Sequence, residues 1–190
     1  MSNRPGKVQG SSIGPKPHVV GKSSNVIRDG RVRVAGINVE GGKLYLAAVT
    51  PSSTAKVLAA PIFSGARRLE LNTGLDEARG LVDLAERIEQ DLRELELQRI
   101  ALVKTRKTSA LTYSEAFSRI SIVCSAMWAC VACDVQFEEI STSVIAKQVG
   151  AEAKRLEDTM PELFGFVSAP TYWRAGMAKA FAATAVLLKV

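Results

Sequence analysis

The groups in this chain best suited to chemistry are cations that follow short apolar stretches. Residues 105–109 read Thr-Arg-Lys-Thr-Ser and combine two cations with three hydroxyl groups. Side chains of these types contact phosphate oxygens in protein–nucleic acid complexes. The run therefore predicts a phosphate-contacting loop, and a plain solvated loop is the alternative interpretation.

The positions of the three cysteines favour a structural role over a redox or zinc-binding role. Cys130 and Cys133 form a CxxC at the end of an apolar predicted helix that also holds Cys124. A redox CxxC normally begins a helix, where the helix dipole lowers the thiol pKa. A zinc site needs further ligands, and the sole histidine, His18, is distant and leaves no Ser-His-Asp set. Buried structural cysteines are expected.

Composition favours one globular domain with a tail. The chain has 190 residues, of which 47% are hydrophobic. No run of 18 or more uncharged apolar residues and no apolar leader segment is present. The odd number of cysteines argues against a secreted disulfide framework. These features predict a cytoplasmic protein without a membrane segment.

The positive charge is concentrated at the N-terminus. The formal net charge is +6, and residues 1–30 carry five cations against one acid, a net of +4, which leaves +2 for the other 160 residues. Residues 1–29 lack hydrophobic periodicity and are predicted to form a disordered basic arm. Residues 30–190 are the predicted domain, and its near-neutral charge alone is weak support for nucleic-acid binding.

The first part of the domain has the pattern of strands. Residues 31–38 and 43–50 alternate in polarity and are joined by Gly41-Gly42, which is typical of a hairpin turn. Residues 55–60, before Pro61, are a third candidate strand, and 61–75 are predicted to be a loop. The pattern indicates an antiparallel meander.

Helices and further strands alternate after it. Helical spacing predicts a helix that begins at Asp76 and Glu77, and residues 100–103 favour a buried strand. A second helix is predicted over 113–132, with 122–131 deeply buried and Trp128 in the core. The remaining predicted elements are a strand over 135–140, a short helix over 143–149, a helical stretch over 151–158 and a last helix over 172–189.

The element order βββ-α-β-α-β-α resembles that of an RNase H-like domain of the RuvC type. The resemblance covers about residues 31–190 and is closest to a small, uncharacterised bacterial RuvC-like family. Three segments carry it: Val34–Gly42, Ile100–Lys107, and Val135–Ile140 with Val144–Lys147. It implies an α/β fold with a five-stranded mixed sheet flanked by helices.

The resemblance also implies where catalytic carboxylates would stand. Active RuvC-type nucleases hold two divalent ions with acids on strands 1 and 4 and on the last helix. The strand-1 position maps to Asn38, the strand-4 position to Lys104, and the last-helix stretch to residues 174–179, which contain no carboxylate. A catalytically degenerate, nucleic-acid-binding domain is therefore expected, without a cofactor. Its expected phosphate-binding residues are Asn38, Lys104, Arg106, Lys107, Arg174 and Lys179.

Two alternatives remain open at this stage. Displaced carboxylates at Glu40, Glu138 and Glu139 could hold Mg²⁺ or Mn²⁺ and retain metal-dependent nuclease activity. Alternatively, the apolar helix over 113–132 could form a homodimer surface of a structural or interaction subunit. DNA is expected as the partner rather than RNA. Tyr172 and Trp173, beside Arg174, could stack on bases or pack on the sheet edge.

Overall fold

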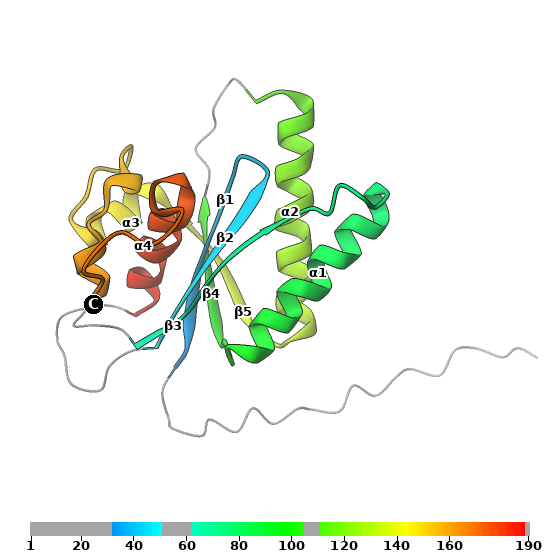
Figure 1. Ribbon diagram of the computed structural model, residues 1–190. Helices are drawn as coiled ribbons and strands as arrows, with labels where there is room; N and C mark the ends of the chain where they lie inside the picture. Colours follow the sequence, from blue (N-terminus) through cyan, green and yellow to red (C-terminus); the bar gives the residue numbers. More distant parts are fainter. Residues whose placement is uncertain (1–31, 51–61, 105–110, 189–190) are drawn as a thin grey trace, which may run out of the picture.

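A five-stranded mixed sheet lies between two layers of helices in the computed structural model, which describes residues 32–50, 62–104 and 111–188 (Figure 1). The strand order is β3-β2-β1-β4-β5. The strands are β1 (Val34–Glu40), β2 (Lys43–Thr50), β3 (Ile62–Glu70), β4 (Arg99–Lys104) and β5 (Gln136–Ser141). The helices are α1 (Glu77–Glu94), α2 (Tyr113–Ala132), α3 (Thr142–Val149) and α4 (Ala178–Leu187), with shorter turns between α3 and α4.

The sheet has the expected mixed pairing. β1 pairs antiparallel with β2 and β2 antiparallel with β3, whereas β4 runs parallel to β1 and β5 parallel to β4. Gly41 and Gly42 both have positive φ, 57° and 69°, as the tight hairpin turn requires. The carboxyl ends of β1, β4 and β5 therefore meet at one edge of the sheet.

The prediction of a loop over residues 61–75 is wrong for Ile62–Glu70, which form β3. The segment was missed because it lacks a clear alternation of apolar and polar residues. An edge strand can carry such residues, and Arg67 of β3 pairs with Asp91 of α1 at 3.0 Å. The predicted strand over 55–60 lies outside the described residues.

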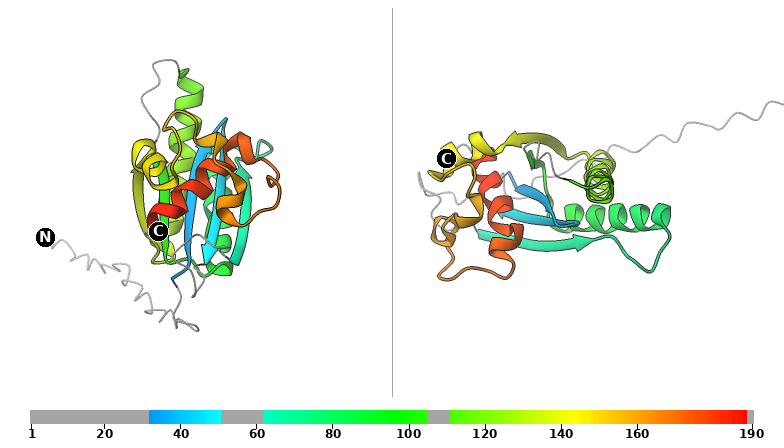
Figure 2. Two further views of the ribbon diagram at one scale, coloured as in Figure 1. Left: turned by 90° about the vertical axis from the view of Figure 1, so that its left-hand side faces the viewer. Right: turned by 90° about the horizontal axis from the view of Figure 1, so that it is seen from above.

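The two helical layers cover opposite faces of the sheet, α1 and α2 on one side and α3 and α4 on the other (Figure 2). Residues alternate along β1 accordingly: Ala35, Ile37 and Val39 belong to the core beneath α1 and α2. On the other face, an added Cβ at Gly36 would lie 1.8 Å from the carbonyl oxygen of Ala180 in α4. This close approach sets α4 directly over the centre of β1.

The starts of α1 and α2 confirm the predicted boundaries. The side chain of Asp76 accepts a hydrogen bond from the backbone N–H of Arg79 and caps α1. Thr112 and Glu115 form a capping box at the start of α2, and hydrogen bonds from Thr112 lower the pKa of the Glu115 carboxyl. The caps therefore fix where α1 and α2 begin.

The expected deep burial of the second half of α2 is wrong. Ile122, Ala126 and Ala129 are buried, but Trp128 is 70% exposed and is not a core residue. Only one side of the helix is covered, by α1 and the sheet. Apolar residues all round a helix predict burial only when protein lies on every side.

The C-terminal region differs from the prediction in two places. Residues 151–158 contain a single 3₁₀ turn, Leu156–Asp158, in place of a longer helical stretch. The last helix is preceded by a π-helical turn, Trp173–Met177, in which Gly176 has a φ of 146°. α4 itself is buried almost all round.

The cysteines and α2 test two further expectations. Burial raises the pKa of the Cys130 thiol to about 12 and also raises that of Cys133, whereas Cys124 is exposed. The expected burial is therefore confirmed for Cys130, is partial for Cys133 and is wrong for Cys124. Within the described residues α2 is the one helix whose length and composition would suit a membrane span, although a third of that window is buried inside the protein.

Candidate nucleic-acid interface

Asn38 lies near the carboxyl end of β1 and faces α4. It is only 5% exposed, and its amide nitrogen donates to the Glu40 carboxylate at 3.1 Å and to the Gly176 carbonyl at 3.3 Å. Both contacts require a donor, which an aspartate at this position would not supply at neutral pH. The amide therefore suits its surroundings, and it links the first strand to the turn before α4.

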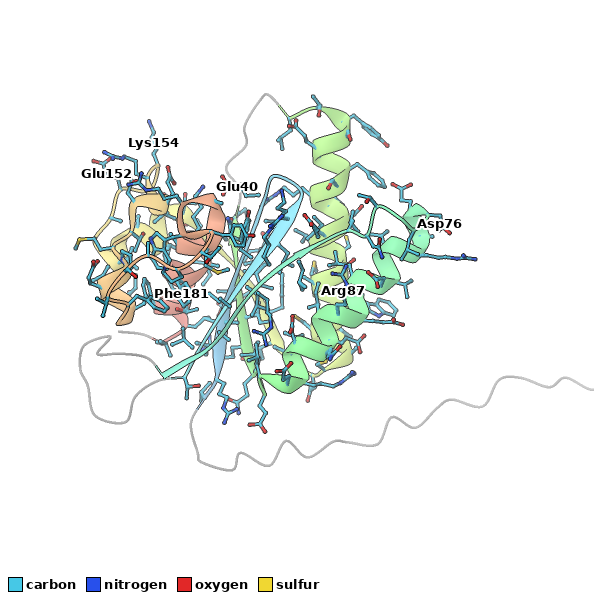
Figure 3. All side chains as sticks on the ribbon, in the orientation of Figure 1. Glu40, Asp76, Arg87, Glu152, Lys154 and Phe181 are labelled. Carbon is cyan, nitrogen blue, oxygen red and sulfur yellow. The ribbon has the colours of Figure 1, made fainter. Side chains whose placement is uncertain are left out.

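Glu40 ends β1 two residues later and pairs with a cation from α4. The Lys179 ammonium lies 3.1 and 2.9 Å from the two Glu40 carboxylate oxygens and 3.5 Å from the Glu157 carboxylate. The ammonium thus lies between carboxylates of two separate segments. Figure 3 shows Glu40 at the end of the β1–β2 hairpin, close to the helical layer that contains α4.

Lys104 belongs to the same edge of the sheet but to its other face. β1 and β4 are parallel with Ile37 beside Leu102, so the β4 neighbour of Asn38 is the buried Val103. The exposed Lys104 ammonium lies 3.6 Å from the Glu139 carboxylate of β5. The structure therefore brings Lys104 to the end of the sheet without placing it against Asn38.

Arg119 is the functional candidate that sequence reasoning missed most clearly. Its guanidinium donates to the carbonyl oxygen of Val39 from the middle of α2. Burial lowers the pKa of this side chain, while Glu40 and Glu139 act in the opposite direction. An arginine in an otherwise apolar helix was the available signal, because a cation there needs an internal partner.

These residues surround a cavity of about 800 Å³ at the carboxyl end of the sheet. Its walls come from the β1–β2 turn, the end of β4, the start of α2, the start of α3 and residues 153–157. We call this cavity the strand-end cleft. Its cations are Lys104, Arg119, Lys154 and Lys179, its acids are Glu40, Glu115 and Glu157, and its hydroxyl groups are Ser114, Ser118 and Thr142.

The acids proposed for a displaced metal site do not come together. Glu138 pairs with Arg99 at 2.8 Å on one face of the sheet, and Glu139 pairs with Lys104 on the other. Among the residues that the structure describes, no group of three or more His, Cys, Asp or Glu side chains could hold a metal ion. A divalent-metal site of the type implied by the resemblance does not fit here, because the Lys179 ammonium already lies against Glu40.

The remaining predicted phosphate contacts are more scattered. Arg106 and Lys107 lie outside the described residues. Arg174 is 83% exposed, lies 3.9 Å from the Asp158 carboxylate and does not line the strand-end cleft. Of the six predicted positions, the cleft therefore contains Asn38, Lys104 and Lys179.

Tyr172 and Trp173 have separate roles in the structure. Trp173 is buried, and its indole nitrogen donates to the carbonyl oxygen of Thr159 at 2.8 Å. Tyr172 is half-exposed, and the Arg68 guanidinium lies 4.7 Å from the centre of its ring. Trp173 packs inside the protein, so base stacking by this residue is excluded.

No family model and no curated protein matches this chain. Solved structures do match its fold. RuvC from Thermus thermophilus aligns with a TM-score of 0.65 and 12% identity over 83% of this chain and 96% of that one. The same enzyme in complex with a Holliday junction substrate gives 0.65 and 12%, with 81% of this chain and 91% of that one covered.

A eukaryotic resolvase gives a similar result. The yeast mitochondrial Holliday junction resolvase Ydc2 aligns with a TM-score of 0.58 and 12% identity over 81% of this chain and 76% of that one. At such low identity these matches establish the fold. The chain has the RNase H-like fold of the RuvC type that its sequence suggested, with a five-stranded mixed sheet and flanking helices.

Proposed function

We propose that this chain binds DNA through the strand-end cleft and does not cleave it by metal-dependent chemistry. The observation that carries the proposal is the position of Lys179, whose ammonium lies 2.9 Å from Glu40 and 3.5 Å from Glu157. A fixed cation there repels divalent ions. The proposal is supported by the similar fold of a RuvC that was solved with a Holliday junction.

Lys104 and Lys154 are the cations best suited to first contact with DNA. Both line the cleft, and Lys104 is 61% exposed and pairs at 3.6 Å with a Glu139 carboxylate that is itself half-exposed. Arg119 and Lys179 lie deeper and hold the β1 end in place through Val39 and Glu40. The exposed pair therefore contributes phosphate affinity, whereas the deeper pair maintains the shape of the cleft.

The test is fluorescence anisotropy with labelled single-stranded, duplex and four-way-junction DNA and with RNA, at about 50 and 200 mM salt with Mn²⁺ present. We expect binding to DNA that weakens steeply with salt, because phosphate contacts release counterions. Intact probes on a gel afterwards would agree with a non-cleaving domain. Cut probes would instead support a metal-dependent nuclease that uses Glu40, Glu138 or Glu139.

Charge-reversal variants locate the binding surface. Lys154→Glu and Lys104→Glu are each expected to weaken binding at least tenfold at low salt and to reduce the salt slope by about one per lost phosphate contact. Lys147→Glu is the matched control, since Lys147 is an exposed cation of α3 that does not line the cleft. Equal losses in all three variants would show that binding depends on net charge alone.

A further inference from the structure

Tyr172 presents an aromatic ring to solvent from a strained position of the backbone. Its φ is 63°, in the left-handed region that bulky side chains rarely adopt. Such strain costs free energy, and it is concentrated at ligand sites and other functional positions. The ring is nevertheless 47% exposed, so packing inside the protein recovers only part of this cost. The position of Tyr172 is therefore better explained by a contact that the ring makes with a ligand.

Arg68 of β3 holds this ring in place from the sheet. Its guanidinium carbon lies 4.7 Å from the centre of the Tyr172 ring, and its Nε is buried without a hydrogen-bond partner among the described residues. One terminal nitrogen of the same guanidinium lies 3.2 Å from the Glu70 carboxylate. The guanidinium is thus positioned by the ring and by Glu70. We call Tyr172 and Arg68 together the Tyr172 platform.

The Tyr172 platform lies at the same edge of the sheet as the strand-end cleft. Asn38 of β1 is in register with Tyr45 of β2, and Tyr45 is in register with Arg68, so the three residues form one row across the sheet. At about 4.8 Å per strand, the backbone of Arg68 lies about 10 Å from that of Asn38. An added Cβ at Gly176 would lie 2.6 Å from the Tyr45 ring, so the turn before α4 packs directly over this row. A DNA strand in the cleft could therefore reach the platform within a few nucleotides.

The charge of the platform suits a nucleobase better than a phosphate group. The Glu70 carboxylate already neutralises the Arg68 guanidinium and would repel a phosphate. Every nucleobase has a π face that can stack on an aromatic ring, whatever the sequence. Arg68 lies over one face of the Tyr172 ring, which leaves the opposite face as the surface on which a base would stack.

We propose that Tyr172 stacks on an unpaired base of a DNA strand whose backbone lies in the strand-end cleft. The inference rests on the proposed function and names its substrate class, which is DNA with an unpaired segment in preference to a fully paired duplex. In a continuous duplex each base is already stacked on its neighbours, and taking it out of the stack costs free energy. Arg174, two residues further on and 83% exposed, is then a cation beside the same nucleotide.

A fluorescent base tests the stacking directly. 2-Aminopurine, which is quenched by stacking, is placed in turn at each position of a single strand of about 12 nucleotides. The native chain and Tyr172→Phe should quench one position, or two adjacent positions, that Tyr172→Asn leaves unquenched. The same fluorescence with all three proteins at every position would overturn the proposal.

Affinity provides a second test. Tyr172→Asn removes the ring and introduces a residue that tolerates a φ of 63°. It should weaken binding to single-stranded DNA by about 5- to 150-fold, the range expected for one stacked base, and leave duplex affinity unchanged. Tyr172→Phe is the matched control, because it keeps the ring and should bind the single strand as the native chain does. Equal losses for single-stranded and duplex DNA would overturn the proposal.

The stacking and the proposed function fail in different ways. Binding that Lys154→Glu weakens and Tyr172→Asn does not would retain the cleft and overturn the stacking alone. Absence of binding to every DNA probe would overturn both. Single-stranded binding that Lys154→Glu and Tyr172→Asn each weaken, with duplex binding sensitive only to Lys154→Glu, would support both.

Discussion

Replacing Asn38 by aspartate tests whether the strand-end cleft depends on a donor at this position. The Asn38 amide nitrogen lies 3.1 Å from a Glu40 oxygen and 3.3 Å from the Gly176 carbonyl oxygen, in a site that is 5% exposed. An ionised aspartate there faces two acceptors and donates to neither. We therefore expect Asn38→Asp to destabilise the protein at neutral pH.

The magnitude follows from these contacts. A buried acceptor left without its donor costs about 1–3 kcal/mol. Two carboxylates at that separation would repel by about 5 kcal/mol at an effective dielectric constant of 20. The Lys179 ammonium, 2.9 Å from the same Glu40 carboxylate, offsets most of this repulsion. The net loss in unfolding free energy is about 2–4 kcal/mol, or roughly 5–15 °C in Tm.

The loss of unfolding free energy in Asn38→Asp should become smaller as the pH falls. The crowded site raises the pKa of the introduced aspartate above its unfolded value of about 3.9. The destabilisation is therefore complete above the folded pKa and disappears as the pH falls below about 4. Stability of the variant relative to the native chain should recover between pH 7 and pH 4.

The assay is urea and thermal unfolding followed by circular dichroism, in EDTA. Asn72→Asp is the control, since the exposed Asn72 side-chain oxygen accepts from the Gly74 N–H and a carboxylate accepts equally well. Equal stability of Asn38→Asp and the native chain at pH 7 would refute the reasoning.

The double variant Asn38→Asp/Lys179→Asp extends the test to metal binding. It removes the ammonium and places four carboxylates together, including those of Glu40 and Glu157. Mn²⁺ at a hundred times its Kd should stabilise this variant by about 2.7 kcal/mol. The native chain should gain nothing. An equal gain in both proteins would show that Lys179 does not exclude the ion.

Three further changes test the rest of the structure. Gly36→Ala should cost at least about 3 kcal/mol in urea unfolding, because the added Cβ would lie 1.8 Å from a carbonyl oxygen of α4; native-like stability would rule out this close packing. At pH 8, Ellman's reagent should label Cys124 rapidly and Cys130 only on unfolding, since burial raises the pKa of Cys130 to about 12; equal labelling rates would contradict its burial. Thr112→Ala should lower the unfolding free energy by about 1 kcal/mol through loss of the α2 cap, whereas Thr112→Ser should keep the cap and the native stability. Equal losses in the two variants would show that the hydroxyl group does not stabilise the start of α2.

The fold was largely predictable because local signals agreed with one another. The Gly41-Gly42 turn, the cap at Asp76 and the apolar period of the helices each determine a boundary through short-range chemistry. β3 was missed because an edge strand is selected by its pairing with β2, which no local pattern encodes. Trp128 was misplaced because hydrophobicity does not reveal which side of a helix lacks a neighbour.

The candidate site was predictable only in part for a related reason. Asn38, Lys104 and Lys179 were found by their positions at strand and helix ends, and all three line the cleft. Arg119 and Lys154 were missed because the cleft draws on α2 and on an irregular segment that meet only in three dimensions. The Lys179–Glu40 pair joins residues far apart in the chain, so its geometry required the folded structure.

The hydrogen bond from Asn38 to the Gly176 carbonyl has a consequence for how the protein folds. Its two partners are separated by 138 positions, so the hydrogen bond closes a loop that contains most of the described residues. Contacts of such long sequence separation form late, because the entropy of loop closure must be overcome first. A folding chain therefore leaves Asn38 without its contact to Gly176, and Glu40 without its contact to Lys179, until the segment that leads into α4 has docked on β1. The strand-end cleft is complete only after this late step of folding.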